Sequence, residues 1–150
     1  MKNLGEPETL HAVRERLWTV EPGDLPRWGT MSVGQMIRHL GLAYDMSLGN
    51  FVAAPVKGPP PWLLKFAALK VNMNWPPNVR TTPELKRAIQ QAVPQDSLDA
   101  DIMETAARME ELASGLRYAP SHPMFGAMKP ADWLRWGYLH ADHHLRQFGR

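Results

Sequence analysis

Residues 130–148 read PADWLRWGYLHADHHLRQF, and this stretch holds three of the chain's six histidines. Pro130 suits the first position of a helix. The apolar residues after it recur at helical spacing, at Leu134, Tyr138, Ala141, Leu145 and Phe148. The pattern therefore predicts an amphipathic helix that begins at Pro130 and whose apolar stripe runs to Phe148.

A helical wheel separates the three histidines of this helix. At about 100° per residue, His140 and His144 lie together on one flank of the apolar stripe, one turn apart. Arg135, Asp142 and Arg146 lie on the other flank, which reads as the face toward water. His143 points nearly opposite the stripe, so a solvated position is expected for it.

Two histidines four residues apart can both reach one metal ion, as in helical zinc motifs. A third ligand must come from another element. His39 is the best candidate, because it holds the same kind of position beside the apolar stripe of an earlier helix. The alternative is that these histidines are simply packed core residues.

Three further long helices are predicted. The first covers residues 7–20. The second begins after Ser32, with Gln35 as its capping-box partner, and ends near Leu48 before Gly49. The third begins after Ser97 and ends at Gly115.

The proline-rich residues 50–82 form a long crossover with one short helix over 61–71, and another short helix is predicted over 82–92. Aromatic residues of this crossover, such as Trp62 and Trp75, either cover a pocket or close one end of the helices.

These elements predict an all-α protein, a four-helix bundle in a single domain over residues 1–150. The chain has no cysteine, so a metal site must use nitrogen and oxygen ligands, and any thiol must be an external cosubstrate. The net charge is only +2 with no Lys/Arg run, so neither nucleic acid nor a membrane is expected as a partner. No apolar signal segment precedes the first helix, and a cytoplasmic location is expected.

Two blocks resemble the DinB/YfiT-like superfamily, and in particular a branch described as a domain of unknown function. They are WGTMSVGQMIRHL at 28–40 and HPMFG at 122–126 continuing to HADHHLRQF at 140–148. The resemblance implies a four-helix bundle with a long crossover, frequent dimerisation, and a metal held by three histidines that map onto His39, His140 and His144. The superfamily includes metal-dependent thiol S-transferases, a mycothiol-dependent isomerase and hydrolases.

The sequence thus predicts a divalent metal ion with an open position, zinc by default and nickel, iron or manganese as alternatives. The expected function is a metal-dependent enzyme, S-transferase-like or hydrolase-like, acting on a small molecule and using a low-molecular-weight thiol in the first case. The alternative is a non-catalytic metal- or ligand-binding bundle, stress-related or a structural homodimer. Gln35 and Gln147 are candidates for orienting ligands or substrate, and His122 and His143 for proton transfer in the pocket. For His122, a structural role in its turn is the competing reading.

Overall fold

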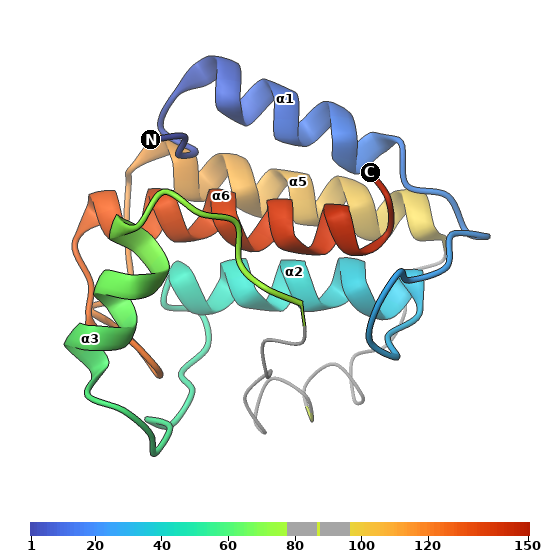
Figure 1. The fold of residues 1–150 in the computed structure, drawn as a ribbon. Coiled ribbons are helices and arrows are strands. Elements are labelled where there is room, and N and C mark those ends of the chain that lie inside the picture. Colours follow the sequence, from blue (N-terminus) through green and yellow to red (C-terminus); the bar gives the residue numbers. More distant parts are fainter. Residues whose placement is uncertain (78–86, 88–96) are drawn as a thin grey trace.

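The computed structural model describes residues 1–77, 87 and 97–150. Its long helices are α1 (Pro7–Trp18), α2 (Val33–Ser47), α5 (Leu98–Ser114) and α6 (Pro130–Gln147). They lie side by side with their axes roughly aligned (Figure 1). The prediction of an all-α chain is confirmed in the sense that the described part is mostly helical.

Local sequence signals end these helices where expected. Ser32 caps α2, its hydroxyl accepting from the Gln35 N–H while the Gln35 side chain accepts from the Ser32 N–H. The Ser97 hydroxyl caps α5 by accepting from the Ala100 N–H. Gly115 ends α5 with φ of 76°, a left-handed conformation that glycine adopts without strain. The predicted helix over 82–92 lies outside the described residues, apart from Arg87.

The core lies between the four long helices, and α6 is its central element. Helix α6 contacts α1, α2 and α5, as well as the crossover. The Tyr44 hydroxyl donates to the Gly137 carbonyl at 3.1 Å, and a Cβ added at Gly137 would lie 2.7 Å from Leu4. The missing side chain at Gly137 therefore lets neighbouring residues approach α6 closely. The largest fully buried side chains include Leu17, Met36, Ile37, Leu40, Tyr44, Met109, Leu112, Trp133 and Leu139.

The crossover packs over the start of α6. It contains α3 (Pro61–Lys65), which continues directly into a π-helical segment, η1 (Phe66–Lys70). Lys70 and Lys65 reach Asp132 in the first turn of α6, with N···O distances of 2.9 and 3.5 Å. A two-residue antiparallel ribbon, β1 (Ser121–His122) with β2 (Gly126–Ala127), precedes α6 and contacts α3. No strand was expected from the sequence; this ribbon closes a tight turn rather than forming a layer.

The prediction that one flank of α6 faces water is wrong. Arg135, Asp142 and His143 are only 6, 7 and 4% exposed. Asp142 is covered by Arg16 of α1 and by Arg146, each at 2.8 Å. Because α6 is surrounded on several sides, its polar flank is buried against partners instead of facing solvent.

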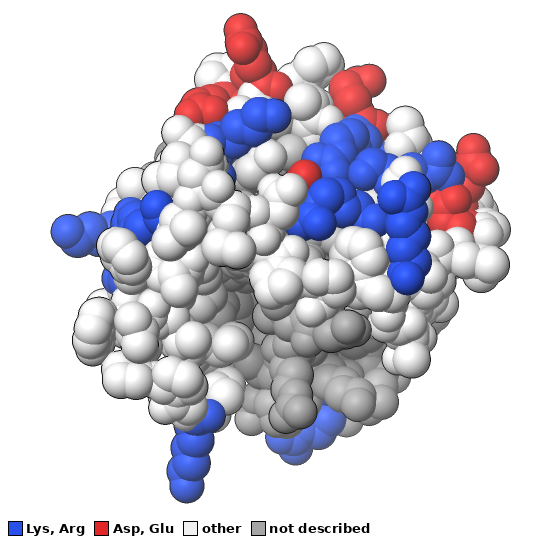
Figure 2. Space-filling view, in the orientation of Figure 1, with Lys and Arg blue, Asp and Glu red and all other residues white. Residues whose placement is uncertain are grey.

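The charged side chains are mixed on the face shown in Figure 2, where basic groups at the upper right lie next to acidic ones. The lower part of that face carries few charges among the described residues. None of the helices in the described part of the chain combines the length and apolarity that crossing a membrane requires.

Candidate metal centre

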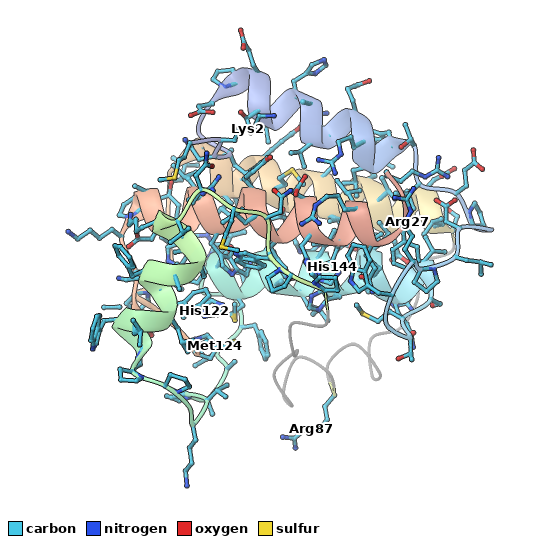
Figure 3. All side chains as sticks on the ribbon, in the orientation of Figure 1. Lys2, Arg27, Arg87, His122, Met124 and His144 are labelled. Atoms are coloured by element: carbon cyan, nitrogen blue, oxygen red, sulfur yellow. The ribbon has the colours of Figure 1, made fainter. Side chains whose placement is uncertain are left out.

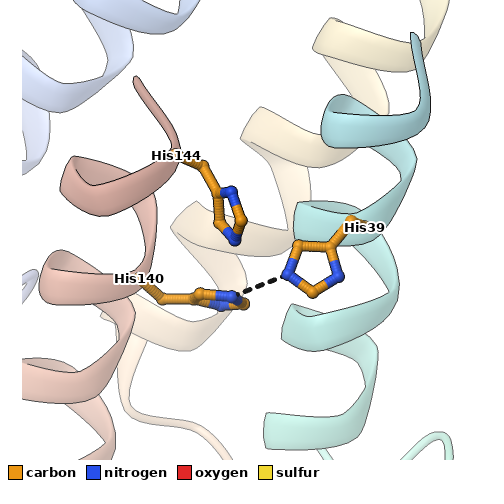
Figure 4. A group of neighbouring side chains, drawn as sticks. All are labelled: His39, His140 and His144. Carbon is orange, nitrogen blue, oxygen red and sulfur yellow. Dashed lines mark hydrogen bonds between the residues drawn. The ribbon is translucent and has the colours of Figure 1, made fainter. Parts of the chain in front are cut away.

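Three histidines converge between α2 and α6. Helix α2 supplies His39, and α6 supplies His140 and His144 one turn apart (Figure 4). The Nε2 atoms of His39 and His140 are 2.9 Å apart, and one ring nitrogen from each of the three histidines lies within 4.8 Å of the others. The rings meet edge to face, with the His39 centroid 4.8 Å from His140 and 4.5 Å from His144. The structure thus brings together the three residues that the sequence nominated.

Gln147 fixes the orientation of His144. Its amide nitrogen donates to the Trp28 carbonyl at 2.7 Å, which leaves the amide oxygen, Oε1, to accept from His144 Nδ1 at 2.8 Å. The proton of neutral His144 is therefore assigned to Nδ1, and the Nε2 lone pair is free. This is the arrangement that orients a metal-binding imidazole in proteins.

The three nitrogens, all within 4.8 Å of one another, could hold a divalent metal ion. Ligands about 2.0–2.1 Å from one ion lie about 2.9–3.4 Å apart for angles between 90° and tetrahedral. The 2.9 Å between the Nε2 atoms of His39 and His140 falls at the lower end of this range. The Nδ1 atoms of both residues are buried with no hydrogen-bond partner among the described residues, so the Nδ1 bond that orients His144 has no counterpart at His39 or His140. Three neutral nitrogen donors leave at least one coordination position for another ligand.

Burial keeps these histidines neutral. It lowers the pKa of His39 and of His140 well below the ordinary value, and neighbouring histidines lower both pKa values further. Burial likewise lowers the pKa of His144 to about 4, although its hydrogen bond with Gln147 acts in the opposite direction. Metal ions bind the neutral form of imidazole, so the ligand set is ready for a metal throughout the neutral pH range.

The three histidines lie at one side of a cavity of about 410 Å³. Its walls come from α2, the crossover, the 122–125 turn and α6, and none of the described lining residues is acidic or basic apart from histidine. The apolar lining consists of Met46, Leu64, Ala67, Ala68, Met73, Trp75, Pro76, Pro123, Met124, Phe125 and Trp136. The site therefore offers metal-binding nitrogens to a ligand whose remaining surface contacts apolar groups.

The other nominated residues divide into two groups. His122 and His143 line the cavity, and Gln147 supports His144 from behind. Figure 3 shows His122 and His144 on the same side of α6, toward α2. Gln35 lies elsewhere, because its side-chain oxygen accepts from the Ser32 N–H at 2.9 Å and completes the helix cap.

The expectation that His143 is solvated is wrong. Trp28 and Trp75 pack over its ring, with centroid distances of 5.7 and 6.3 Å. Burial lowers the pKa of His143, and a hydrogen bond with the Trp75 backbone partly opposes this. Both tryptophans lie on segments between helices, so a helical wheel of α6 cannot reveal this cover.

Several cavity residues were not nominated from the sequence. The Trp136 ring lies against His140 at a tilted angle, with a centroid distance of 4.8 Å, and Met46 and Phe125 line the same space. The Trp75 ring lies 6.1 Å from His140. The only sequence signal was the set of aromatic residues in the proline-rich crossover, of which Trp75 covers the cavity. Trp62 is 68% exposed and does not.

Comparison with known proteins identifies the family. The model of the family described as "Protein of unknown function (DUF1569)" matches residues 6–150, and the chain belongs to this family. No curated protein and no solved structure was found to match the chain.

Proposed function

We propose that this member of the DUF1569 family is a metal-dependent enzyme whose divalent ion is held by His39, His140 and His144. The single observation that carries the proposal is the convergence of three buried imidazoles on one point at the wall of a cavity. A purely structural histidine cluster would not need an adjoining space of about 410 Å³. When bound, such an ion lowers the pKa of a coordinated water or thiol and so supplies a nucleophile at neutral pH.

The chain's own residues would bind the ion, orient its ligands and keep water away from them. Gln147 holds His144 in the tautomer that leaves Nε2 available. The rings of Trp75 and Trp136 lie near His140, at 6.1 and 4.8 Å between ring centroids. These rings keep bulk water away from the ligand set and offer flat apolar surfaces to a substrate.

Of the two reaction classes, the cavity favours thiol transfer to an apolar electrophile. No carboxylate lies among its described lining residues to activate a water molecule as a general base. The chain has no cysteine, so the thiol is an external cosubstrate. In the transfer the thiol releases its proton to water, sulfur bonds to the electrophilic atom, and the bond from that atom to the leaving group breaks, so that the leaving group departs with the bonding electrons. Hydrolysis at the same ion is the second candidate.

We also propose that the four long helices form a bundle of the DinB/YfiT type. The order of the elements supports this, with a long crossover between α2 and α5 and with metal-site histidines on the second and last long helices. Homodimerisation, which the resemblance implies, stays a prediction that light scattering can check.

The first experiment is metal content by elemental mass spectrometry on tag-free protein. We expect about one divalent ion per chain in the wild type and its loss in His39→Ala and in His144→Ala. The matched control is His11→Ala, since His11 is exposed on α1 and outside the cavity. Metal retained in His144→Ala, or no binding of zinc, nickel, iron or manganese by the wild type, would refute the proposal.

Turnover separates the enzyme from a binding protein. Metal-loaded protein is screened with thiols and apolar electrophiles, and with ester, amide and lactone substrates. Thiol consumption that requires the metal and is lost in His39→Ala supports the transferase. A fully loaded protein that is inert toward every panel would instead indicate a non-catalytic metal- or ligand-binding protein.

A further inference from the structure

His122 is one of two cavity histidines that the proposed metal site does not use, and the other is His143. His122 belongs to β1 and its ring stacks on Phe125, with centroids 4.5 Å apart and planes 18° from parallel. The Met124 N–H donates to His122 Nδ1 at 3.1 Å. Because Nδ1 accepts this bond, the proton of the neutral ring is assigned to Nε2.

The only hydrogen bond of the His122 ring among the described residues uses Nδ1, and Nε2 is not one of the fully buried unpartnered atoms, so Nε2 has no protein partner there and stays accessible. The residue is 7% exposed, and it lines the cavity. Burial lowers the pKa of His122 to about 3, so the ring stays neutral at physiological pH. A backbone bond on one side and aromatic contacts with Phe125, Trp133 and Trp136 hold this ring in place. A donor at the wall of a cavity that has no protein partner among the described residues can bind an acceptor on a ligand.

We propose that His122 is a substrate-binding residue whose Nε2–H donates a hydrogen bond to a carbonyl-type oxygen of a neutral, largely apolar substrate. The inference rests on the proposed function, because it places the oxygen in the cavity that adjoins the three metal-site histidines. It adds the chemical class of the substrate, which the metal site alone does not specify.

The surroundings of His122 define that class further. Trp136 contacts both His122 and His140, at centroid distances of 5.5 and 4.8 Å. The oxygen bound at His122 is therefore separated from the reacting group by an apolar part that packs on the Trp136 indole. Among the described lining residues, Asn74 is the only polar one besides the histidines and the tryptophan N–H groups, and none is cationic, so an anionic substrate gains no ion pair from them.

The test compares two probes that differ by one oxygen, 1-indanone and indane. Both are small enough for the cavity, and only the ketone carries an acceptor. Binding is followed by tryptophan fluorescence and by calorimetry, on metal-free and on zinc-loaded protein. We expect the wild type to prefer the ketone by about three- to tenfold in both forms, as one hydrogen bond predicts.

The variant is His122→Phe, which keeps an aromatic ring against Phe125 and removes the donor. It should bind indane as the wild type does and lose the ketone preference, while its zinc content stays unchanged. His122→Gln, whose amide offers an N–H, should restore part of the preference. The exposed control, His11→Phe, should behave like the wild type. An unchanged ketone preference in His122→Phe would overturn the proposal.

Nuclear magnetic resonance of the wild type tests the proposal without a substitution. In protein labelled with ¹⁵N-histidine, His122 should carry its proton on Nε2, and 1-indanone but not indane should shift this signal. A proton on Nδ1, or no shift with the ketone, would contradict the proposal. If the wild type binds no metal but 1-indanone still shifts the His122 signal, the proposed function is refuted, while the proposal for His122 is supported.

Discussion

Gln147 Oε1 lies 2.8 Å from His144 Nδ1, one turn further along α6, while the same amide donates to the Trp28 carbonyl. One side chain thus joins the α1–α2 connection to the candidate metal centre. It makes His144 present Nε2 to His39 and His140 before any ion arrives. This preorganisation should appear in the affinity for the metal.

Replacing Gln147 by leucine should weaken zinc binding by about 10- to 100-fold, because His144 loses the acceptor that fixes its tautomer. Competition with a chromophoric chelator measures the affinity. The matched control is Gln35→Leu on α2, which removes a helix-capping side chain away from the cavity and should leave the affinity within about twofold of the wild type. Equal affinities of wild type and Gln147→Leu would contradict the role given to this amide.

The metal-free protein should lose stability as the pH falls below about 6.5. Burial lowers the folded-state pKa of His144 to about 4 and of His122 to about 3, while the unfolded chain titrates near 6.5. Between these values the unfolded state binds more protons, so acid favours unfolding. Each of the two should lower the free energy of unfolding by about 2 kcal/mol between pH 7 and 5.

Urea unfolding of wild type and His122→Gln at several pH values measures this effect. The variant should show the smaller loss between pH 7 and 5, since one buried neutral histidine has been removed. Between pH 7 and 8 both proteins should show the same dependence. If the free energy of unfolding falls equally in the two proteins below pH 6.5, the explanation for His122 is wrong.

Asp132 should anchor the crossover to α6. Its carboxylate receives Lys70 at 2.9 Å and the Lys129 N–H at 3.1 Å. Burial acts to raise the pKa of Asp132, but these hydrogen bonds and the charges of Lys70 and Lys65 outweigh it and leave the pKa below the ordinary value. Its stabilising contribution is therefore present at neutral pH and lost as the pH falls through the lowered folded-state value.

Asp132→Asn should lower the free energy of unfolding by about 1–3 kcal/mol at pH 7, since charge-assisted hydrogen bonds are lost. Glu15→Gln, at an exposed acidic position of α1, is the control and should change it by less than about 0.5 kcal/mol. The difference between wild type and Asp132→Asn should shrink in acid. A variant as stable as the wild type at pH 7 would show that the crossover does not depend on this carboxylate.

Trp75 should slow the release of the metal. Its indole N–H donates to the Ala68 carbonyl at 3.0 Å, and its ring lies over His140 and His143. Trp75→Ala opens this cover, so zinc should pass to an excess of chelator severalfold faster. Trp62→Ala is the matched control, because Trp62 is 68% exposed and lies outside the cavity. Identical release rates for the two variants would mean that Trp75 does not cover the exit path.

Local signals were sufficient for much of the fold and for the three nominated ligands. Ser32, Ser97 and Gly115 mark helix ends through bonds and dihedral angles that span only a few residues, so they can be read from the sequence. The four-residue spacing of His140 and His144 places both on one face of any helix that forms there. The position of His39 beside an apolar stripe follows from the same periodicity.

Which other faces of α6 are buried could be learned only from the tertiary structure. A helical wheel assumes one buried face, but α6 is packed against three other helices and the crossover, so Asp142 and His143 are buried on faces that the wheel assigns to water. Trp28 and Trp75 reach His143 from segments without periodicity, and their positions depend on how the chain returns across the helices. The same holds for the donor at His122. Its residue type is visible in the sequence, and its contacts with Met124 and Phe125 lie within its own turn. Its contacts with Trp133 and Trp136 and its place in the cavity exist only once the turn has packed against α6 and the crossover.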